Sequence, residues 1–238
     1  MGEVIELDGV AIQVTRKRVK HVHLTVHPPD GRVTLVAPPN TRPEVARAYA
    51  ITKLGWIRRQ QQALREQARE SPRRHVTRES HQLWGRRHLL MVVEVDAPPK
   101  VVLDHRRILL HVRPGSDAAR RAEIMHAWHR QLLHAELPPL IARWETRLGV
   151  KVAGYFLQRM KTKWGSCNHR AGNIRLNTEL VKKPKDLVEY VLVHEMIHLL
   201  EPTHNERFIA LLSRHWPQWQ TSRAELNALP LGSGVWSE

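Results

Sequence analysis

The sequence contains one cysteine, Cys167, in 238 residues. A single thiol cannot form an internal disulfide, so the fold depends on a packed core. The absence of disulfides is typical of a protein from a reducing compartment. No stretch reaches the roughly 18 uninterrupted apolar residues that a membrane helix needs. The opening residues MGEVIELDGV also lack the basic and apolar segments of a secretory signal. The sequence therefore predicts a cytoplasmic protein with no membrane association.

Aromatic residues are scarce at 5% of the chain, and acidic residues are fewer than basic residues. The 38 Lys and Arg residues against 23 Asp and Glu give a formal net charge of +15. With 42% hydrophobic and 26% charged residues, the composition is that of a globular protein with a buried core. A positive field attracts phosphates, nucleic acid or acidic peptides, although simple solvation of surface charge explains the same excess.

The amino-terminal half is rich in short strand patterns. Apolar residues over 4–7, 10–15, 21–26 and 32–37 predict a small antiparallel sheet, and a helix is predicted at about 41–69. A polar connector over 70–80 precedes further strands over 88–95 and 101–112. We expect a strand-rich region over residues 1–115 and a mainly helical region over 116–238, packed as one compact unit. No internal repeat is evident.

The carboxy-terminal half is predicted to be mainly helical. Residues 113–150 indicate a long helix or a helix pair, because Pro138 and Pro139 should kink or split the run. Strands over 155–160 and 173–177 flank a polar turn, KTKWGSCNHRAG, and a further helix begins near Pro184 and ends near Leu200. These elements predict the α+β class.

The stretch HEMIHLLEPTH, residues 194–204, has the composition of a metal site. His194 and His198 lie four residues apart on the predicted helix, so they project from one face and can bind one metal ion. Glu195 is placed to act as the general base on a metal-activated water. The chain has 16 histidines, so a chance match is the alternative. The amphipathic helix around the motif favours the metal site.

His204 is the predicted third metal ligand, because a catalytic zinc usually has three protein ligands and leaves a fourth position for water. Pro202 should end the helix and let the chain turn back toward the metal. Glu206 and Glu225 are alternative third ligands, ranked below His204.

The spacing of the three histidines equals that of the metzincins, H-E-x-x-H-x-x-G-x-x-H. Glu201 stands where metzincins have a glycine, and no methionine follows Met196 to form a Met-turn. A metzincin assignment is therefore not favoured.

Several stretches resemble the YgjP-like metallopeptidase family, which has distant relatives among the SprT-type and M48-type zincins. They are RMKTKWGSCNHRAGNIRLNTELVKKP, YVLVHEMIHLLEPTHNERF, HWPQW and, nearer the amino terminus, TLVAPPNTRPEVARAYAITKLGWIRRQQQ. The resemblance implies a zincin-like catalytic core, with the motif helix packed on a small sheet. It implies His194, His198 and His204 as ligands of Zn²⁺, or of another divalent transition metal, and Glu195 as the catalytic carboxylate.

Polar and aromatic residues around these motifs have weaker assignments. An oxyanion would be stabilised by one of Lys161, Lys163, Arg175 and Asn177, and sequence does not choose among them. Packing is the favoured role for Trp164, Cys167, Trp216 and Trp219, although a catalytic or metal-switching Cys167 is the minority interpretation.

We interpret the chain as a zinc-dependent metallohydrolase, in the first place a metallopeptidase acting on peptides or proteins. One alternative is a nucleoside-triphosphate pyrophosphohydrolase with the same metal site, although the chain lacks a G-x-x-x-x-G-K-[ST] loop and a carboxylate cluster for magnesium. The other is a basic DNA-associated accessory protein with a structural metal, which would bind nucleic acid through its positive surface.

Overall fold

The computed structural model describes residues 3–27, 31–66, 73–160 and 163–228. Helices and small sheets alternate along the chain, which confirms the α+β class. Contacts between Cα atoms divide the chain into two units, Met1–Ala68 and Arg69–Glu238, beside the polar segment 70–80. The boundary expected between residues 115 and 116 lies inside the second unit, and that division stays a prediction. No helix in the described ranges is both long and apolar enough to cross a membrane.

The first unit is a four-stranded sheet with one helix. Its sheet has the order β1-β2-β4-β3, and β2 pairs with β4 in parallel while the other two pairings are antiparallel. The expectation of a wholly antiparallel sheet is therefore wrong at one pairing, because the second strand of the β3–β4 hairpin is the one that lies beside β2. The elements are β1 (Glu3–Leu7), β2 (Val10–Arg16), β3 (His23–His27), β4 (Arg32–Ala37) and the helix α1 (Pro43–Glu66).

The second unit begins with the same arrangement. Its first sheet has the order β5-β6-β8-β7, again with one parallel pairing in the middle, and a helix follows the last strand. The first two strands of each sheet are joined by a two-residue turn with positive φ angles, at Asp8-Gly9 and Trp84-Gly85. The structure thus repeats a β-β-β-β-α arrangement that the sequence does not reveal. The elements are β5 (Ser80–Leu83), β6 (Arg86–Glu94), β7 (Lys100–Asp104), β8 (Arg107–Val112) and α2 (Ala118–Leu148).

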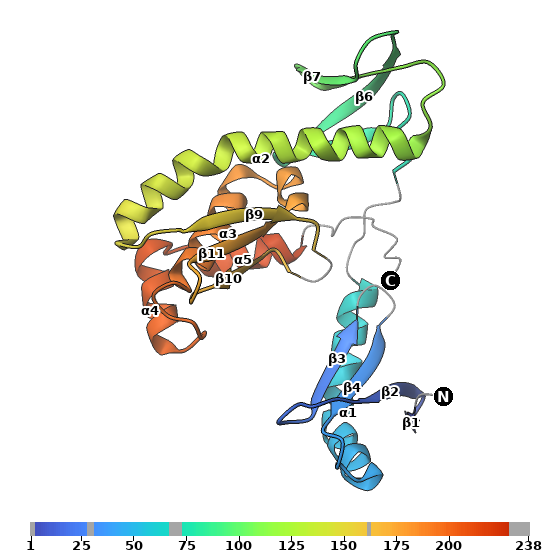
Figure 1. The fold of residues 1–238 in the computed structure, drawn as a ribbon, viewed down its shortest axis with the longest axis vertical. Helices are drawn as coiled ribbons and strands as arrows, with labels where there is room; N and C mark the ends of the chain where they lie inside the picture. Colours follow the sequence, from blue (N-terminus) through green and yellow to red (C-terminus); the bar gives the residue numbers. More distant parts are fainter. Residues whose placement is uncertain (1–2, 28–30, 67–72, 161–162, 229–238) are drawn as a thin grey trace. The chain divides into compact units, whose positions relative to one another are not determined.

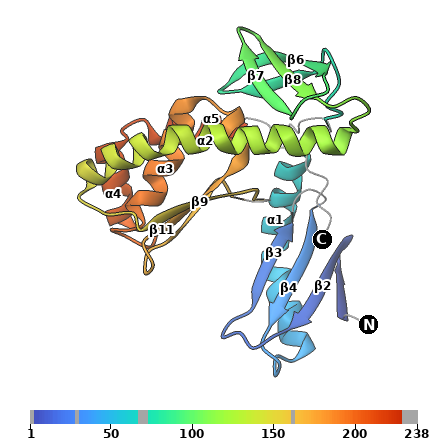
Figure 2. The same ribbon diagram turned by 45° about the horizontal axis from the view of Figure 1, so that its top comes forward.

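Helix α2 is one continuous helix of 31 residues that runs through Pro138 and Pro139 (Figure 1). Of the two predicted alternatives, the long helix is confirmed and the helix pair is wrong. A proline inside a helix removes a backbone hydrogen bond at a cost of about 3 kcal/mol. Burial on both sides of the prolines offsets this cost, because the helix face carrying Leu133, Leu137, Ile141, Trp144 and Leu148 packs into the core of the second unit. Figure 2 shows the β6–β8 sheet beside one part of α2 and the strand β9 and helix α3 beside another.

The remaining elements form the part of the second unit that carries the histidine motif. A three-stranded sheet has the order β10-β11-β9, and the motif helix α3 packs against β10 and β11. This confirms the predicted motif helix on a small sheet. Strand β10 lies within the expected polar turn, so that expectation is wrong there. The elements are β9 (Gly154–Gln158), β10 (Gly165–Asn168), β11 (Asn173–Asn177), the 3-10 helix η1 (Thr178–Lys182), α3 (Lys185–Ile197), α4 (Glu206–His215) and α5 (Trp219–Ala228).

The β5–β6 turn packs against the residues that precede α3. The backbone N–H of Trp84 donates to the carbonyl of Val181 at 2.9 Å, and that of Gly85 donates to Lys182 at 3.2 Å. A Cβ added at Gly85 would lie 2.7 Å from Cγ of Pro184, the residue that precedes α3. Only glycine fits this close approach with a φ of +75°. The second sheet therefore helps to fix the helix that carries the motif.

Candidate metal centre

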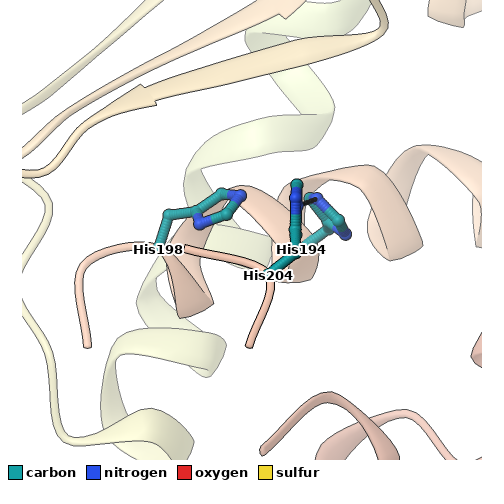
Figure 3. Close-up of side chains that lie close together, drawn as sticks. All are labelled: His194, His198 and His204. Carbon is teal, nitrogen blue, oxygen red and sulfur yellow. Dashed lines mark hydrogen bonds between the residues drawn. The ribbon is translucent and has the colours of Figure 1, made fainter. Parts of the chain in front are cut away.

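Three imidazole rings converge at the carboxy-terminal end of α3. His194, His198 and His204 each offer a ring nitrogen, and these nitrogens all lie within 4.8 Å of one another. In Figure 3 the three rings lie close together, two from the motif helix and its end and one from the chain that follows. The structure thus brings together all three histidines that the sequence predicts as ligands. Glu206 and Glu225 lie outside this group in the described part of the chain.

The local chain path follows from the end of α3. The helix ends at Ile197, three residues before the predicted end near Leu200, but His198 keeps helical dihedral angles of −63° and −14°. His198 therefore stays one turn from His194 on the same face. The N–H of Glu201 donates to the carbonyl of Ile197 at 2.9 Å. The chain then passes Pro202 and returns His204 to the other two rings.

A hydrogen bond sets the orientation of the His198 ring. Its Nδ1 lies 3.1 Å from the carbonyl oxygen of Glu201, and because a carbonyl only accepts, Nδ1 carries the proton. The lone pair is then on Nε2, as a metal ligand requires. The backbone of Glu201, the residue that replaces the metzincin glycine, thus has its own contact with the site.

Phe208 lies against all three imidazoles, and sequence reasoning missed it. Its ring centroid is 5.0 Å from that of His194, 4.6 Å from that of His198 and 4.7 Å from that of His204, and the side chain is fully buried. The side chain of Asn205 begins α4 by accepting from the N–H of Phe208 at 3.0 Å. This cap places Phe208 on the first turn of α4. The N-x-x-F spacing directly after His204 was the available signal.

The donor set fits a divalent transition metal. Burial, followed by the charges of His198, His204 and Arg223, lowers the pKa of His194 to about 4, so its ring is neutral near pH 7 and can donate a lone pair. Nε2 of His194 and Nε2 of His204 are 3.0 Å apart. Two nitrogen lone pairs at this distance repel unless a proton or a cation lies between them. Three neutral imidazoles are a common ligand set for zinc.

Glu195 faces the same site from the adjacent position on α3. Its side chain is 6% exposed, and burial raises its pKa to about 8, with Lys163 acting in the opposite direction. The carboxylate packs tightly against strand β10: a Cβ added at Gly165 would lie 2.5 Å from Oε1 and 2.6 Å from Cγ of Glu195. Gly165 has no positive φ, so it is the absent side chain at this position that matters. Glycine is what allows the carboxylate to lie against the strand.

Gly165→Ala is therefore expected to move the Glu195 carboxylate without unfolding the chain. The start of β10 cannot easily retreat, because the N–H of Asn177 donates to the carbonyl of Trp164 at 2.9 Å. We expect the rate of a hydrolysis that depends on this carboxylate to fall about 100-fold, as for misplacement of a reacting group by about 1 Å, with unchanged metal content. Gly154→Ala is the matched control, since it adds the same methyl group to strand β9 of the same sheet. Equal kcat values for the two variants would contradict this role of Gly165.

A pocket of about 580 Å³ is lined by the three histidines, by Glu195 and by Gly165, Ser166 and Cys167 of β10. Sequence reasoning missed several further lining residues, among them Tyr190 and Arg223. Tyr190 lies one turn before His194 on α3, and the two ring centroids are 6.2 Å apart. The four-residue spacing from Tyr190 to His194 was a visible signal for it. Arg223 comes from α5, and nothing in the sequence connects it with the motif.

The candidate oxyanion-stabilising residues differ in whether they line the pocket. Lys163 lines the pocket, whereas Arg175 and Asn177 are not among its described lining residues, and Lys161 lies outside the described residues. The amide nitrogen of Asn177 donates to the carbonyls of Met160 and Lys163, each at 2.8 Å. Asn177 thus holds the segment that leads into β10. Lys163 is the remaining candidate among the described members of the set.

The residues expected to pack do so. Trp216 is buried, and Trp164, Cys167 and Trp219 are partly buried against the core of the second unit. Cys167 also lines the pocket. Burial and then the charge of Glu195 raise the pKa of its thiol to about 11, so the thiol is protonated near pH 7 and is a poor nucleophile.

A helix bearing H-E-x-x-H, packed on a small sheet with a third histidine returned to it, defines a zincin-like metallohydrolase core. The family model "YgjP-like, metallopeptidase domain" matches residues 20–229. The chain belongs to the YgjP-like metallopeptidase family, which supports a peptidase-like hydrolase with a catalytic metal.

Comparison with curated proteins gives no match. Among solved structures, the chain is similar to the crystal structure of the metallopeptidase zymogen of Pyrococcus abyssi abylysin, at 18% identity and a TM-score of 0.35. The match covers 37% of this chain and 89% of that one.

Proposed function

We propose that the protein is a zinc-dependent peptidase in which His194, His198 and His204 hold the metal and Glu195 is the general base. The observation that carries this proposal is the convergence of three imidazole nitrogens within 4.8 Å, in one pocket with a buried carboxylate. Zinc, when bound, is a Lewis acid that polarises a carbonyl group and makes water more acidic. A cytoplasmic location stays a prediction from the single cysteine.

The residues of the chain divide the remaining work. In its ionised form, an Oε atom of Glu195 accepts a proton from the attacking water and then gives it to the nitrogen of the leaving amine. The charges of Lys163 and of a bound metal would favour this ionised form, against the burial that raises the pKa of Glu195 to about 8. Gly165 supports the carboxylate on the strand side. Lys163 is the proposed partner of the negative charge that develops on the carbonyl oxygen, since it lines the same pocket and its charge reaches Glu195.

An extended peptide fits the pocket better than a nucleotide does. In the described sheet, β10 pairs with β11 on one side and is the edge strand on the other. Gly165, Ser166 and Cys167 of this strand line the pocket. A free strand edge offers alternating backbone N–H and C=O groups, and an extended peptide can pair with them along its length. A nucleoside triphosphate has no backbone with this alternation of donors and acceptors.

The proposal is tested by assaying peptides and nucleotides side by side. Purified protein is expected to contain about one zinc per chain and to cleave unfolded proteins into peptides. A chelator should abolish the cleavage, and adding back zinc, manganese or cobalt separately identifies the effective metal. Release of pyrophosphate from nucleoside triphosphates without any peptide cleavage would overturn the proposal. So would salt-sensitive DNA binding by a protein that has the metal but no hydrolytic activity.

A further inference from the structure

We propose that helix α5 presents a recognition face to the pocket, and that Arg223 on this face binds a carboxylate of the substrate. The enzyme would then prefer peptides with an acidic side chain or a free carboxyl terminus near the cleaved bond. This inference rests on the proposed peptidase function and deepens it. The α5 face consists of the pocket-lining residues of that helix, which are Trp219, Arg223, Leu226 and Asn227.

The spacing of these residues makes one continuous surface. They follow one another at four, three and one positions, so an α-helix projects them from the same side. The side that faces the pocket therefore combines an aromatic ring, a guanidinium, an aliphatic chain and an amide. The apolar members can contact substrate methylene groups, while Arg223 supplies the charge.

The face is held in place by contacts outside the pocket. Helix α5 packs against α3, and Leu226 is 4% exposed within the core of the second unit. Nε1 of Trp216 donates to the buried Oγ of Ser222 at 3.0 Å, and Nε1 of Trp219 donates to Oγ of Ser213 at 3.0 Å. Arg223 thus extends from a fixed helix, which is the condition for a defined recognition group.

The charges in the pocket favour an anionic substrate group. Arg223 and Lys163 are cations among the described lining residues, and Glu195 is the one carboxylate in that set. Glu195 is buried and packed against Gly165. Within the described ranges, Arg223 has no hydrogen bond or ion pair with a carboxylate of the chain. A metal held by three neutral histidines would add further positive charge.

Arg223 is also close to the reacting centre. It lines the same pocket as His194, His198, His204 and Glu195. The planar guanidinium can hold a carboxylate with two parallel hydrogen bonds, which a lysine cannot do. A substrate carboxylate bound there would lie near the metal ligands and fix the position of the peptide in the pocket.

The test uses matched peptides that differ by Glu, Gln or Lys at each position near the cleaved bond, with free or amidated carboxyl termini. The wild-type protein is expected to show a kcat/KM about tenfold higher for the preferred carboxylate peptide than for its neutral counterpart. Loss of the preference on amidation assigns the carboxylate to the chain terminus, and its persistence assigns it to a side chain. Arg223→Glu should reverse the preference toward Lys. Arg130→Glu makes the same charge change on the exposed side of α2, away from the pocket, and should keep the wild-type preference.

Failure of this inference is distinguishable from failure of the proposed function. Equal kcat/KM values for Glu, Gln and Lys peptides, or an Arg223→Glu protein with the wild-type preference, would overturn the recognition by Arg223 and leave the peptidase intact. Binding is also measured without hydrolysis, from the tryptophan fluorescence of the Glu195→Gln variant. Acidic peptides that bind through Arg223 but are never cleaved by the wild-type protein would support the recognition face and overturn the peptidase.

Discussion

Glu195→Gln is expected to lower kcat for peptide hydrolysis about 1000-fold while the protein keeps its metal. The amide has the shape of the carboxylate but cannot accept the proton of the attacking water, and general-base catalysis contributes typically about 10²–10⁴ in rate. Glu195 lies outside the group of three histidine nitrogens, so its replacement removes no proposed ligand. The measurements are kcat on an unfolded protein substrate and the metal content of the purified variant.

The controls for this experiment are Glu206 and Glu225, the alternative third ligands predicted from the sequence. Glu206→Gln and Glu225→Gln change exposed carboxylates on α4 and α5 and should leave both kcat and metal content unchanged. A thermal unfolding curve for each variant separates loss of chemistry from loss of fold. An undiminished kcat in Glu195→Gln would remove this residue as the general base, whereas loss of metal in this variant would show that it acts as a ligand.

The parts of the site that sequence predicted are those set by short-range geometry. His194, His198 and Glu195 follow from helical periodicity, and the return of His204 follows from the break at Pro202. Gly165 was beyond the reach of such reasoning. Gly165 contacts Glu195, which lies thirty residues further along the sequence. No local sequence pattern around either residue predicts this contact.

Strand β10 shows the same limit in the fold. Its residues Gly165–Asn168 have the composition of a turn, because glycine and asparagine are depleted in strands and no apolar alternation is present. Pairing with β11 and packing against α3 make it a strand nonetheless. The feature that hides the strand from sequence reasoning, a glycine where a side chain is expected, is also what admits the Glu195 carboxylate.

Helix α2 and the two four-stranded sheets illustrate tertiary control of local preferences. Local rules predict a kink or a break at Pro138-Pro139, yet burial of the helix face on both sides of these residues keeps α2 continuous. The parallel pairings β2–β4 and β6–β8 depend on which hairpin strand lies inside the sheet. Strand patterns alone located the four strands of the first sheet but missed β5 in the second, and they do not give this order.

His204→Ala is expected to weaken metal binding by more than about 100-fold and to lower kcat/KM correspondingly, because even partners that only orient a ligand contribute about 10–100-fold. Nε2 of His204 lies 3.0 Å from Nε2 of His194, so its removal opens one side of the cluster. His204→Asp should recover part of the affinity, since a carboxylate oxygen is also a zinc ligand. The affinities are measured by competition with a chelator of known strength.

The rival to His204 is Glu206, two residues further along the chain at the start of α4. If Glu206→Ala lost the metal and His204→Ala kept it, α4 would have to supply the third ligand and the assignment of His204 would be wrong. The packing argues for the opposite result. Phe208 contacts the rings of all three histidines, so His204 is held in the same aromatic cluster as His194 and His198, whereas Glu206 lies outside the group of nitrogens.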